Sequence, residues 1–346
     1  MSTDQFPSLT GSKPCCRRDL AGAGVGMLVA ISRQSDTAAR RKRPPQWDNG
    51  EVFSKIGNQY RFANGWGATG TQRGQFHQPH GIASVAGSVY VVDRNNHRVQ
   101  RFSGEGGFIG GWGSLGPGVG QFSAPYGVAV DAGGNVYVTD TGNQRVQKFD
   151  PTGTPLATIG SQGNGPGQYD TPQGIAIDRR GNVFVVDSRN ERIVKFDGAG
   201  NVVAAWGRHG RGKGAFDSPT GIAVDNSGNV FVADTGNNRI QKFDNNGKYL
   251  TRWGEGGEAV GRFDSPIGLA VEATSTSVVI VYVADSSGNR IQKFAFHPGG
   301  DNTMTAFGSE GTANGKLRGP LGVAVDSQRR VFVTDSQNDR VQVFRP

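Results

Sequence analysis

Short runs of β-branched and aromatic residues, separated by turns rich in glycine and asparagine, make up most of the chain from residue 60 onward. β-Branched and aromatic residues favour strands, whereas glycine, proline and asparagine favour tight turns. One stretch shows the pattern clearly, with runs at residues 127–131, 136–139, 145–149 and 156–159. The third run alternates polar and apolar residues, as a half-buried strand does. The pattern predicts four short strands joined by tight turns.

This four-run unit recurs along the chain and is marked by an aspartate, an arginine five residues later and a phenylalanine nine residues later. The marker aspartates are Asp93, Asp140, Asp187, Asp234, Asp285 and Asp335. They are spaced by 47, 47, 47, 51 and 50 residues, close to the length of one four-stranded propeller blade. The repeat therefore predicts an all-β fold, a six-bladed β-propeller of four-stranded antiparallel blades.

The two ends of the repeat region predict how the ring closes. The last copy ends its third strand at Phe344 and lacks a fourth strand. Residues 60–67, ahead of the first copy, resemble the outer strand at residues 108–113. An open sheet edge invites aggregation. We therefore expect the N-terminal strand to pair with the last blade and close the ring.

Residues that recur in every copy serve a need that every blade shares. We interpret the Asp–Arg pairs as structural for this reason, together with the asparagine that follows the aspartate by three residues in five copies. The fifth copy departs here, with Gly288 and then Asn289, and it carries an insertion near residues 273–280. Tryptophans that precede glycine in the outer strands are interpreted as packing between blades.

Composition and charge divide the chain into two regions. The 55 glycines recur at fixed offsets between strand runs, which indicates turns. Residues 1–46 contain eight basic and three acidic residues, so they carry +5 of the net charge of +8 and leave +3 for the rest. The two cysteines, Cys15 and Cys16, both lie in this segment, so no cysteine is left for a disulfide or zinc site in the repeats.

Residues 1–46 are predicted to be a disordered leader, and residues 47–346 the propeller. Within the leader, the pair Arg17-Arg18 precedes an apolar run of 12 residues, from Leu20 to Ile31. A membrane-spanning helix needs about 20 such residues, so no transmembrane segment is predicted. The run resembles a twin-arginine signal peptide. This predicts export to the periplasm or the extracellular space, the alternative being a basic leader on a cytoplasmic protein.

Functional residues should instead differ from blade to blade. The position after the recurrent proline opens the inner strand of each blade, and these six residues are called the rim residues below. They are His80, Tyr126, Gln173, Thr220, Ile267 and Leu321. One side of the ring is polar and the other apolar, which is typical of a binding site at a channel mouth. We take His80, Tyr126, Gln173 and Thr220 as candidate ligand-binding residues, the alternative being that they only fill the channel.

Basic residues form a second candidate site. Arg208, Arg211 and Lys213 lie in one predicted loop, and Arg94 and Arg189 follow the marker aspartates of two blades. Together they are predicted to form a basic face, the alternative being ordinary solvated loop charge.

The motifs together resemble the NHL repeat, in the form found in bacterial propellers. The resemblance rests on Gly-Gln-Phe, Pro-x-Gly-Ile-Ala-Val-Asp, Asn-Val-Tyr-Val-x-Asp and Asn-x-Arg-Val-Gln-Lys-Phe, and it covers residues 60–346. It implies the six-bladed fold, which hosts many functions. Bacterial members resemble exported or cell-surface binding modules, whereas animal members imply single-stranded RNA binding through a basic face.

We therefore predict a monomeric, non-catalytic scaffold that presents a propeller face to a protein, peptide or glycan, with no metal and no cofactor. Single-stranded RNA binding is one alternative. A metal-dependent lyase or lactonase-like hydrolase at the central channel is the other. A zinc lyase of this repeat type has histidines at several rim positions, whereas this chain has only His80 there. Neither a Gly-x-Ser-x-Gly motif nor a His-Glu-x-x-His motif is present.

Overall fold

The computed structural model describes residues 53–57, 59–272 and 277–346. The leader predicted for residues 1–46 lies outside these residues, as do residues 273–276 of the fifth-blade insertion. In the described part of the chain, no helix combines the length and apolar character needed to cross a membrane.

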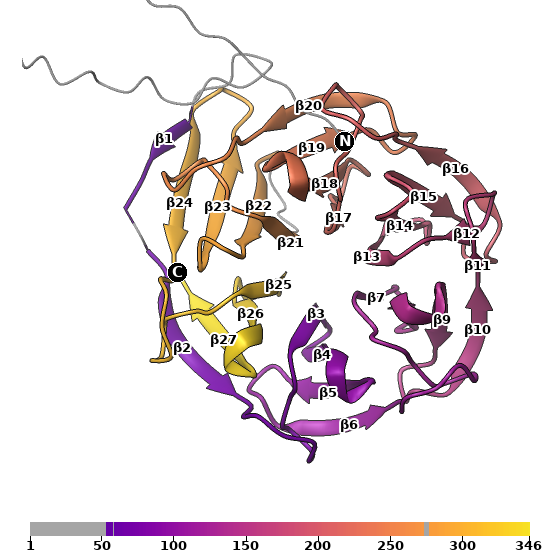
Figure 1. Ribbon diagram of the computed structural model, residues 1–346. Helices are drawn as coiled ribbons and strands as arrows, with labels where there is room; N and C mark the ends of the chain where they lie inside the picture. The colour runs from indigo at the N-terminus through magenta and orange to yellow at the C-terminus, as the bar shows by residue number, and fades with distance from the viewer. Residues whose placement is uncertain (1–52, 58, 273–276) are drawn as a thin grey trace, which may run out of the picture. The chain divides into compact units, whose positions relative to one another are not determined.

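Six antiparallel sheets stand around a central axis, which confirms the predicted six-bladed propeller (Figure 1). Blade 1 contains β3 (Pro79–Val85), β4 (Ser88–Asp93), β5 (Arg98–Ser103) and β6 (Phe108–Trp112). Blade 2 contains β7 (Val128–Val130), β8 (Val136–Asp140), β9 (Arg145–Phe149) and β10 (Pro155–Ile159). Blade 3 contains β13 (Pro172–Ile177), β14 (Val183–Asp187), β15 (Arg192–Phe196) and β16 (Val202–Trp206).

The other three blades follow the same order from the axis outward. Blade 4 contains β17 (Ile222–Val224), β18 (Val230–Asp234), β19 (Arg239–Phe243) and β20 (Tyr249–Trp253). Blade 5 contains β21 (Pro266–Glu272), β22 (Val279–Asp285), β23 (Arg290–Phe296) and β24 (Asn302–Phe307). Blade 6 contains β25 (Pro320–Val325), β26 (Val331–Asp335), β27 (Arg340–Arg345) and β2 (Arg61–Trp66).

Two kinds of short element connect or extend the blades. Single 3₁₀ turns follow the second strand of four blades: η1 (Arg94–Asn96), η2 (Thr141–Asn143), η3 (Thr235–Asn237) and η4 (Ser336–Asn338). β1 (Phe53–Lys55) pairs in parallel outside β24, and β11 (Ser161–Gln162) pairs in parallel with β12 (Gln168–Tyr169).

The ring closes as the sequence predicted. β2 pairs antiparallel with β27, with Phe62 opposite Phe344 and Trp66 opposite Val341. Figure 1 shows this N-terminal strand lying outside the C-terminal strand of blade 6. Since strands from the two ends of the repeat region share one sheet, each of the six blades has its outer strand.

The apolar core lies between neighbouring blades. Phe231 of blade 4, for example, packs in one cluster with Val281 and Phe294 of blade 5. Trp112 of blade 1 contacts Phe149 of blade 2, with ring centroids 5.6 Å apart. The tryptophans therefore pack between blades, as predicted.

The recurrent aspartate and arginine form one buried network per blade. Arginine Nε lies 2.6–2.8 Å from aspartate Oδ2 in all six blades, and the six aspartates are fully buried. The other carboxylate oxygen accepts a loop N–H, as Asp93 does from His77 at 2.8 Å. Buried charges need such partners, so the structural interpretation of this pair is confirmed.

The glycine after each rim residue allows the inner strands to crowd around the axis. The Gly81 N–H donates to the Tyr126 carbonyl of the next blade at 2.9 Å. A Cβ at Gly81 would lie 2.5 Å from that oxygen, and one at Gly221 would lie 1.9 Å from the Ile267 carbonyl. The Pro-x-Gly motif thus fixes where the rim residues stand.

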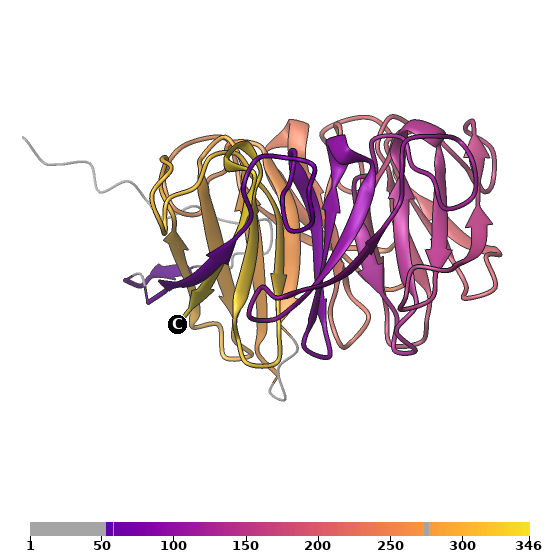
Figure 2. The same ribbon diagram turned by 90° about the horizontal axis from the view of Figure 1, so that it is seen from below.

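The rim residues lie on one particular face of the ring. Loops between blades contact the turns between second and third strands, through bonds such as Asn95 N–H to the His77 carbonyl and Arg189 N–H to the Asp170 carbonyl, each 3.1 Å. We call this side the upper face; it is at the top of Figure 2. Each inner strand begins directly after an inter-blade loop, so its rim residue lies at the upper mouth of the channel.

Candidate functional site

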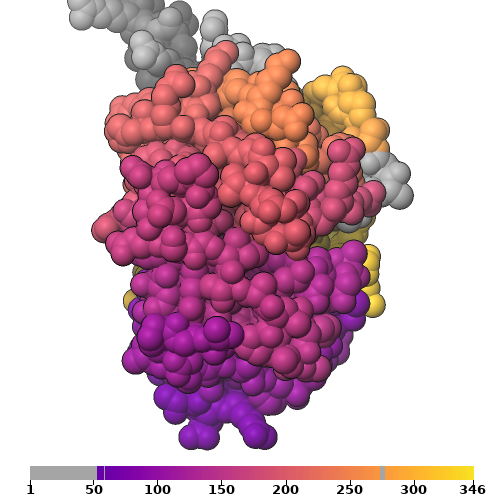
Figure 3. Space-filling view, turned by 90° about the vertical axis from the view of Figure 1, so that its right-hand side faces the viewer, coloured from indigo at the N-terminus to yellow at the C-terminus, as the bar shows by residue number. Residues whose placement is uncertain are grey.

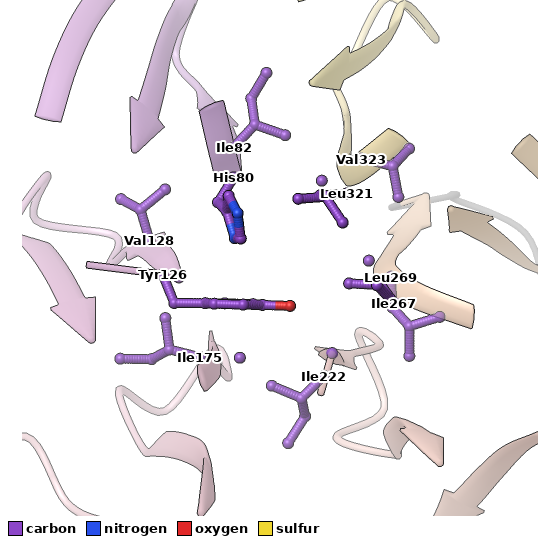
Figure 4. Close-up of a pocket in the computed structure, with 16 residues that line it drawn as sticks. His80, Ile82, Tyr126, Val128, Ile175, Ile222, Ile267, Leu269, Leu321 and Val323 are labelled. Carbon is purple, nitrogen blue, oxygen red and sulfur yellow. The ribbon is translucent and has the colours of Figure 1, made fainter. Parts of the chain in front are cut away.

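A pocket of about 450 Å³, open solvent at its mouth included, lies on the axis of the ring (Figure 4). Each blade contributes one aliphatic side chain to its wall: Ile82, Val128, Ile175, Ile222, Leu269 and Val323. Of the rim residues, His80, Tyr126, Ile267 and Leu321 also line it. The pocket is therefore aliphatic around its whole circumference, and the polar side chains among the described lining residues, His80 and Tyr126, come from blades 1 and 2.

His80 begins the inner strand of blade 1 and is 8% exposed. Its Nδ1 is buried and has no hydrogen-bond partner among the described residues. Burial, and secondarily the charge of Arg94, lower the pKa of His80 to about 3. The ring is thus neutral near pH 7, and it offers an unused polar atom at the mouth.

Tyr126 of blade 2 shapes the mouth. Its ring meets the His80 ring edge-on, with centroids 4.8 Å apart and an interplanar angle of 76°. Figure 4 shows the ring reaching across the pocket with its hydroxyl toward Ile267 and Leu269. Burial raises the pKa of Tyr126, against the smaller opposing effect of Arg94. The hydroxyl therefore stays protonated and can donate a hydrogen bond.

The other two polar candidates are placed differently. Neither Gln173 nor Thr220 belongs to the described residues that line the pocket. Gln173 Oε1 is buried without a partner in the described part of the chain. The Thr220 hydroxyl lies 2.6 Å from the Thr235 hydroxyl of its own blade. The structure thus brings His80 and Tyr126 together and engages Thr220 in a contact within blade 4.

Arg94 was assigned to the basic face, but it stands beside this pocket. It comes directly after Asp93, which is opposite Pro79 in the register of β3 and β4, and His80 is next to Pro79. Its charge lowers the pKa of His80 and opposes the rise at Tyr126. Like Gln173 and Thr220, Arg94 is not one of the described residues that line the pocket. The sequence carried a signal for this role, because the other blades have serine or threonine at this position.

The remaining basic candidates gather on the upper face of blades 3 and 4. Arg189, Arg208, Arg211 and Lys213 are all exposed. The loop of Arg208 approaches the turn of Arg189, because His209 Nδ1 lies 3.4 Å from Glu191. Lys213 turns outward over the Tyr249 ring, 5.6 Å from its centroid. These four cations therefore lie on a loop and a turn that approach each other, and they are called the patch below.

Metal-ligating side chains do not gather in the described residues: no group of three or more histidines, cysteines, aspartates or glutamates there could hold a metal ion. At the rim, His80 alone supplies a nitrogen ligand, whereas catalytic zinc sites use about three protein ligands. The chemistry that the mouth offers is hydrogen bonding, apolar contact and the charge of Arg94.

Fold and repeat together define a class of protein: a six-bladed β-propeller with blade-specific side chains at its channel mouth. The NHL repeat matches residues 76–102, 122–149, 169–196, 216–243 and 317–344. The chain belongs to the NHL-repeat family.

A curated relative matches a short part of the chain. E3 ubiquitin-protein ligase TRIM71 of Gallus gallus is 51% identical over 41 residues, which are 12% of this chain and 5% of that protein. The match therefore corresponds to roughly one repeat, and this chain spans a small fraction of that relative.

Solved structures share the fold at low identity. A streptogramin B lyase has a TM-score of 0.55 and 14% identity over 83% of this chain and 97% of that chain. A gluconolactonase from Xanthomonas campestris has a TM-score of 0.54 and 15% identity over 78% and 86%. An auxiliary nutrient binding protein from Bacteroides thetaiotaomicron has a TM-score of 0.58 and 12% identity over 78% and 69%. Enzymes and a binding protein thus share this architecture, so the fold alone does not decide between them.

Proposed function

We propose that this chain is a non-catalytic binding scaffold whose ligand, a protein, peptide or glycan, occupies the channel mouth on the upper face. The observation that carries the proposal is the pocket itself. It combines an aliphatic wall from all six blades with His80 and Tyr126 on one side, and His80 Nδ1 has no protein partner in the described residues. Apolar concavities with a few convergent polar groups are typical of ligand sites.

The rigidity of the ring supports this role. Inner strands are locked by close glycine contacts, and the buried Asp–Arg networks hold each turn of the upper face. Side chains that differ between blades are thus presented on a fixed frame, which lowers the entropic cost of binding. The same frame supports enzymes in other proteins, but here the rim offers one histidine and no recognisable acid–base pair.

The test is a screen of peptide and glycan arrays against the wild-type protein and the variant His80→Ala/Tyr126→Ala/Gln173→Ala. We expect the triple variant to lose binding by at least about tenfold, since it removes both rings at the mouth. The variant Arg208→Ala/Arg211→Ala/Lys213→Ala is the matched control and should bind as the wild type does. Equal binding by the wild type and the site variant would remove the channel mouth from consideration.

The patch of Arg189, Arg208, Arg211 and Lys213 supports nucleic-acid binding as a second candidate. These four cations are exposed on adjacent loops. Release of counterions from a single strand would give a slope of roughly −3 in log affinity against log salt concentration for four contacts. Titration of labelled oligouridine at several salt concentrations tests this. Nucleic-acid binding by the patch would be excluded if the affinity changed neither with salt concentration nor in the variant Arg208→Ala/Arg211→Ala/Lys213→Ala.

A further inference from the structure

Arg94 breaks the repeat at a position that holds the blades together. The residue after the marker aspartate is serine or threonine in the other five blades. In three of them its hydroxyl donates to the carbonyl of the proline that precedes the next blade's rim residue. These bonds are Thr141 to Pro172 at 2.6 Å, Thr235 to Pro266 at 2.7 Å, and Ser336 to Pro79. In blade 1 this position is Arg94, which has a guanidinium and no hydroxyl to form this bond.

Equivalence within the repeat places the Arg94 side chain. Thr141 reaches the proline before Gln173, so the side chain of Arg94 starts beside Pro125, the proline before Tyr126. This agrees with the effect of its charge on both His80 and Tyr126. Arg94 therefore lies beside the mouth, next to the start of the inner strand of blade 2, although it is not one of the residues that line the pocket.

The Arg94 guanidinium has no anionic partner in the described part of the chain. The repeat arginine four residues on, Arg98, pairs with Asp93 at 2.7 Å, so the carboxylate that directly precedes Arg94 in sequence is already paired. Arg94 Nε is buried and lacks a hydrogen-bond partner among the described residues, as does Nδ1 of His80 beside it. Leaving a half-buried cation with an unpaired hydrogen-bond donor costs free energy, and a bound anion would remove that cost.

The rest of the pocket limits what that anion carries. Opposite Tyr126 the mouth is lined by Ile267 and Leu321, and the aliphatic ring including Ile222 and Leu269 continues the wall. The pocket volume of about 450 Å³ includes open solvent at the mouth, so the part enclosed by the aliphatic wall is smaller and suits a small apolar group. A highly charged or large polar ligand would leave its polar atoms against aliphatic carbon.

We infer that the channel mouth binds a carboxylate attached to a small branched apolar group, with Arg94 as the anchor for the carboxylate. This inference rests on the proposed binding function and names its ligand chemistry. Arginine matches the two oxygens of a carboxylate in a bidentate geometry. The aliphatic wall receives the apolar group.

Two sources supply this chemistry: a free branched-chain acid, and the C-terminal carboxylate of a peptide that ends in an aliphatic residue. The probes are 4-methylpentanoate and its uncharged isostere 4-methylpentanamide, and a tetrapeptide ending in leucine with either a free or an amidated C-terminus. Affinities are measured by methyl NMR on Ile222 and Leu269. Ligands this small bind with dissociation constants on the order of millimolar.

The key variant is Arg94→Thr, which restores the residue found at Thr141 and Thr235. The threonine hydroxyl can donate to the Pro125 carbonyl as Thr141 does to Pro172, so this variant should fold as stably as the wild type. Arg189→Thr removes an exposed arginine of the upper face and serves as the matched control. We expect the wild type and the control to prefer each acid over its amide by at least about tenfold, and Arg94→Thr to lose that preference.

Preference for the free-acid peptide over 4-methylpentanoate identifies a peptide terminus as the source, and equal or weaker peptide binding identifies a small acid. Equal binding of acid and amide, no binding of either probe, or a preference that persists in Arg94→Thr would each overturn the inference. Equal acid and amide binding at the pocket leaves the scaffold proposal standing. The scaffold proposal fails separately, when the His80/Tyr126/Gln173 variant retains binding of an array ligand.

Discussion

Gly221 shows how strongly single residues are fixed near the axis. A Cβ at this position would lie 1.9 Å from the Ile267 carbonyl oxygen, so Gly221→Ala must push two inner strands apart. We expect it to lower the free energy of unfolding by roughly 3 kcal/mol. Urea denaturation measures this, with Gly212→Ala as the control, because no atom lies within 4 Å of a Cβ there. Equal stability of the two variants would contradict the close packing.

The buried, neutral His80 predicts that the folded protein becomes less stable as the pH is lowered. Its pKa is about 3 in the folded protein and 6.5 when exposed. The unfolded chain therefore takes up a proton below pH 6.5 that the folded chain does not, and stability falls as the pH falls through this window. From pH 7 to pH 5 the loss from this group is roughly 2 kcal/mol. Parallel stability profiles of the wild type and His80→Gln would contradict it.

The sequence predicted the structural residues better than the site residues. The Asp–Arg pairs were identifiable because six copies repeat them, and repetition marks a shared structural need. Thr220 and Arg94 were harder to place. Whether the Thr220 hydroxyl faces the channel or Thr235 depends on a rotamer, and whether Arg94 joins the mouth or the patch depends on which blade's proline lies beside it.

Among the elements, each blade is joined to the next by a hydrogen bond. Its acceptor is the side chain of the residue that directly follows the turn between the second and third strands. Here a residue with positive φ accepts a backbone N–H from the loop that begins the next blade. The pairs include His97 Nδ1 with Ala124 at 3.0 Å, Asn238 with Ser265 at 3.0 Å, and Asn289 with Gly319 at 2.9 Å. The sequence did not reveal this join, because histidine, glutamine, glutamate, asparagine and aspartate all perform it.

His97 tests the join directly. His97→Ala leaves the Ala124 N–H without its acceptor and should lower the free energy of unfolding by about 1–2 kcal/mol. His97→Asn should retain most of the stability, because asparagine tolerates positive φ and performs the same role in blades 4 and 5. Thermal denaturation distinguishes them, and an asparagine variant no better than alanine would argue against the hydrogen bond.

The pairing of β2 with β27, which closes the ring, leads to a further prediction. A chain that begins at residue 53 keeps β1 and β2, whereas a chain that begins at residue 67 leaves β27 without its partner. We expect the shorter chain to lose more than about 3 kcal/mol of unfolding free energy and to self-associate through the exposed edge. Chemical denaturation and light scattering measure both effects. A monomeric, equally stable shorter chain would show that closure does not depend on β2.

Strands were predictable from sequence to within a residue or two wherever the repeat was regular. β9 spans Arg145–Phe149, as predicted, and β7 is shorter than its predicted range by one residue at each end. β1 was not predicted, because three residues carry no periodicity and its pairing with β24 is set by the tertiary fold. The outer side of blades 2 and 3 faces the viewer in Figure 3. Leu156, Val202 and Val203, which belong to the outer strands of these blades, are exposed.

At the scale of the whole molecule, export would change the mass of the chain more than its charge. Residues 1–46 carry +5 of the net +8, but four of their eight basic residues are residues 40–43, so a chain cleaved near Ala39 would keep most of the positive charge of the leader. We expect the protein outside the cytoplasm to have the mass of a chain cleaved near Ala39. Intact mass spectrometry of each cell fraction measures this. A full-length chain confined to the cytoplasm would contradict export and strengthen the case for the salt-dependent RNA assay.

The proposed function places the ligand at the channel mouth on the upper face. Its most direct test is methyl NMR mapping of the isoleucine, leucine and valine side chains during titration with array-selected ligands. We expect shifts concentrated at Ile82, Ile222, Leu269 and Leu321, which line the pocket. Shifts confined to Leu156 and Val203 on the outer strands, with the channel methyls unmoved, would contradict it.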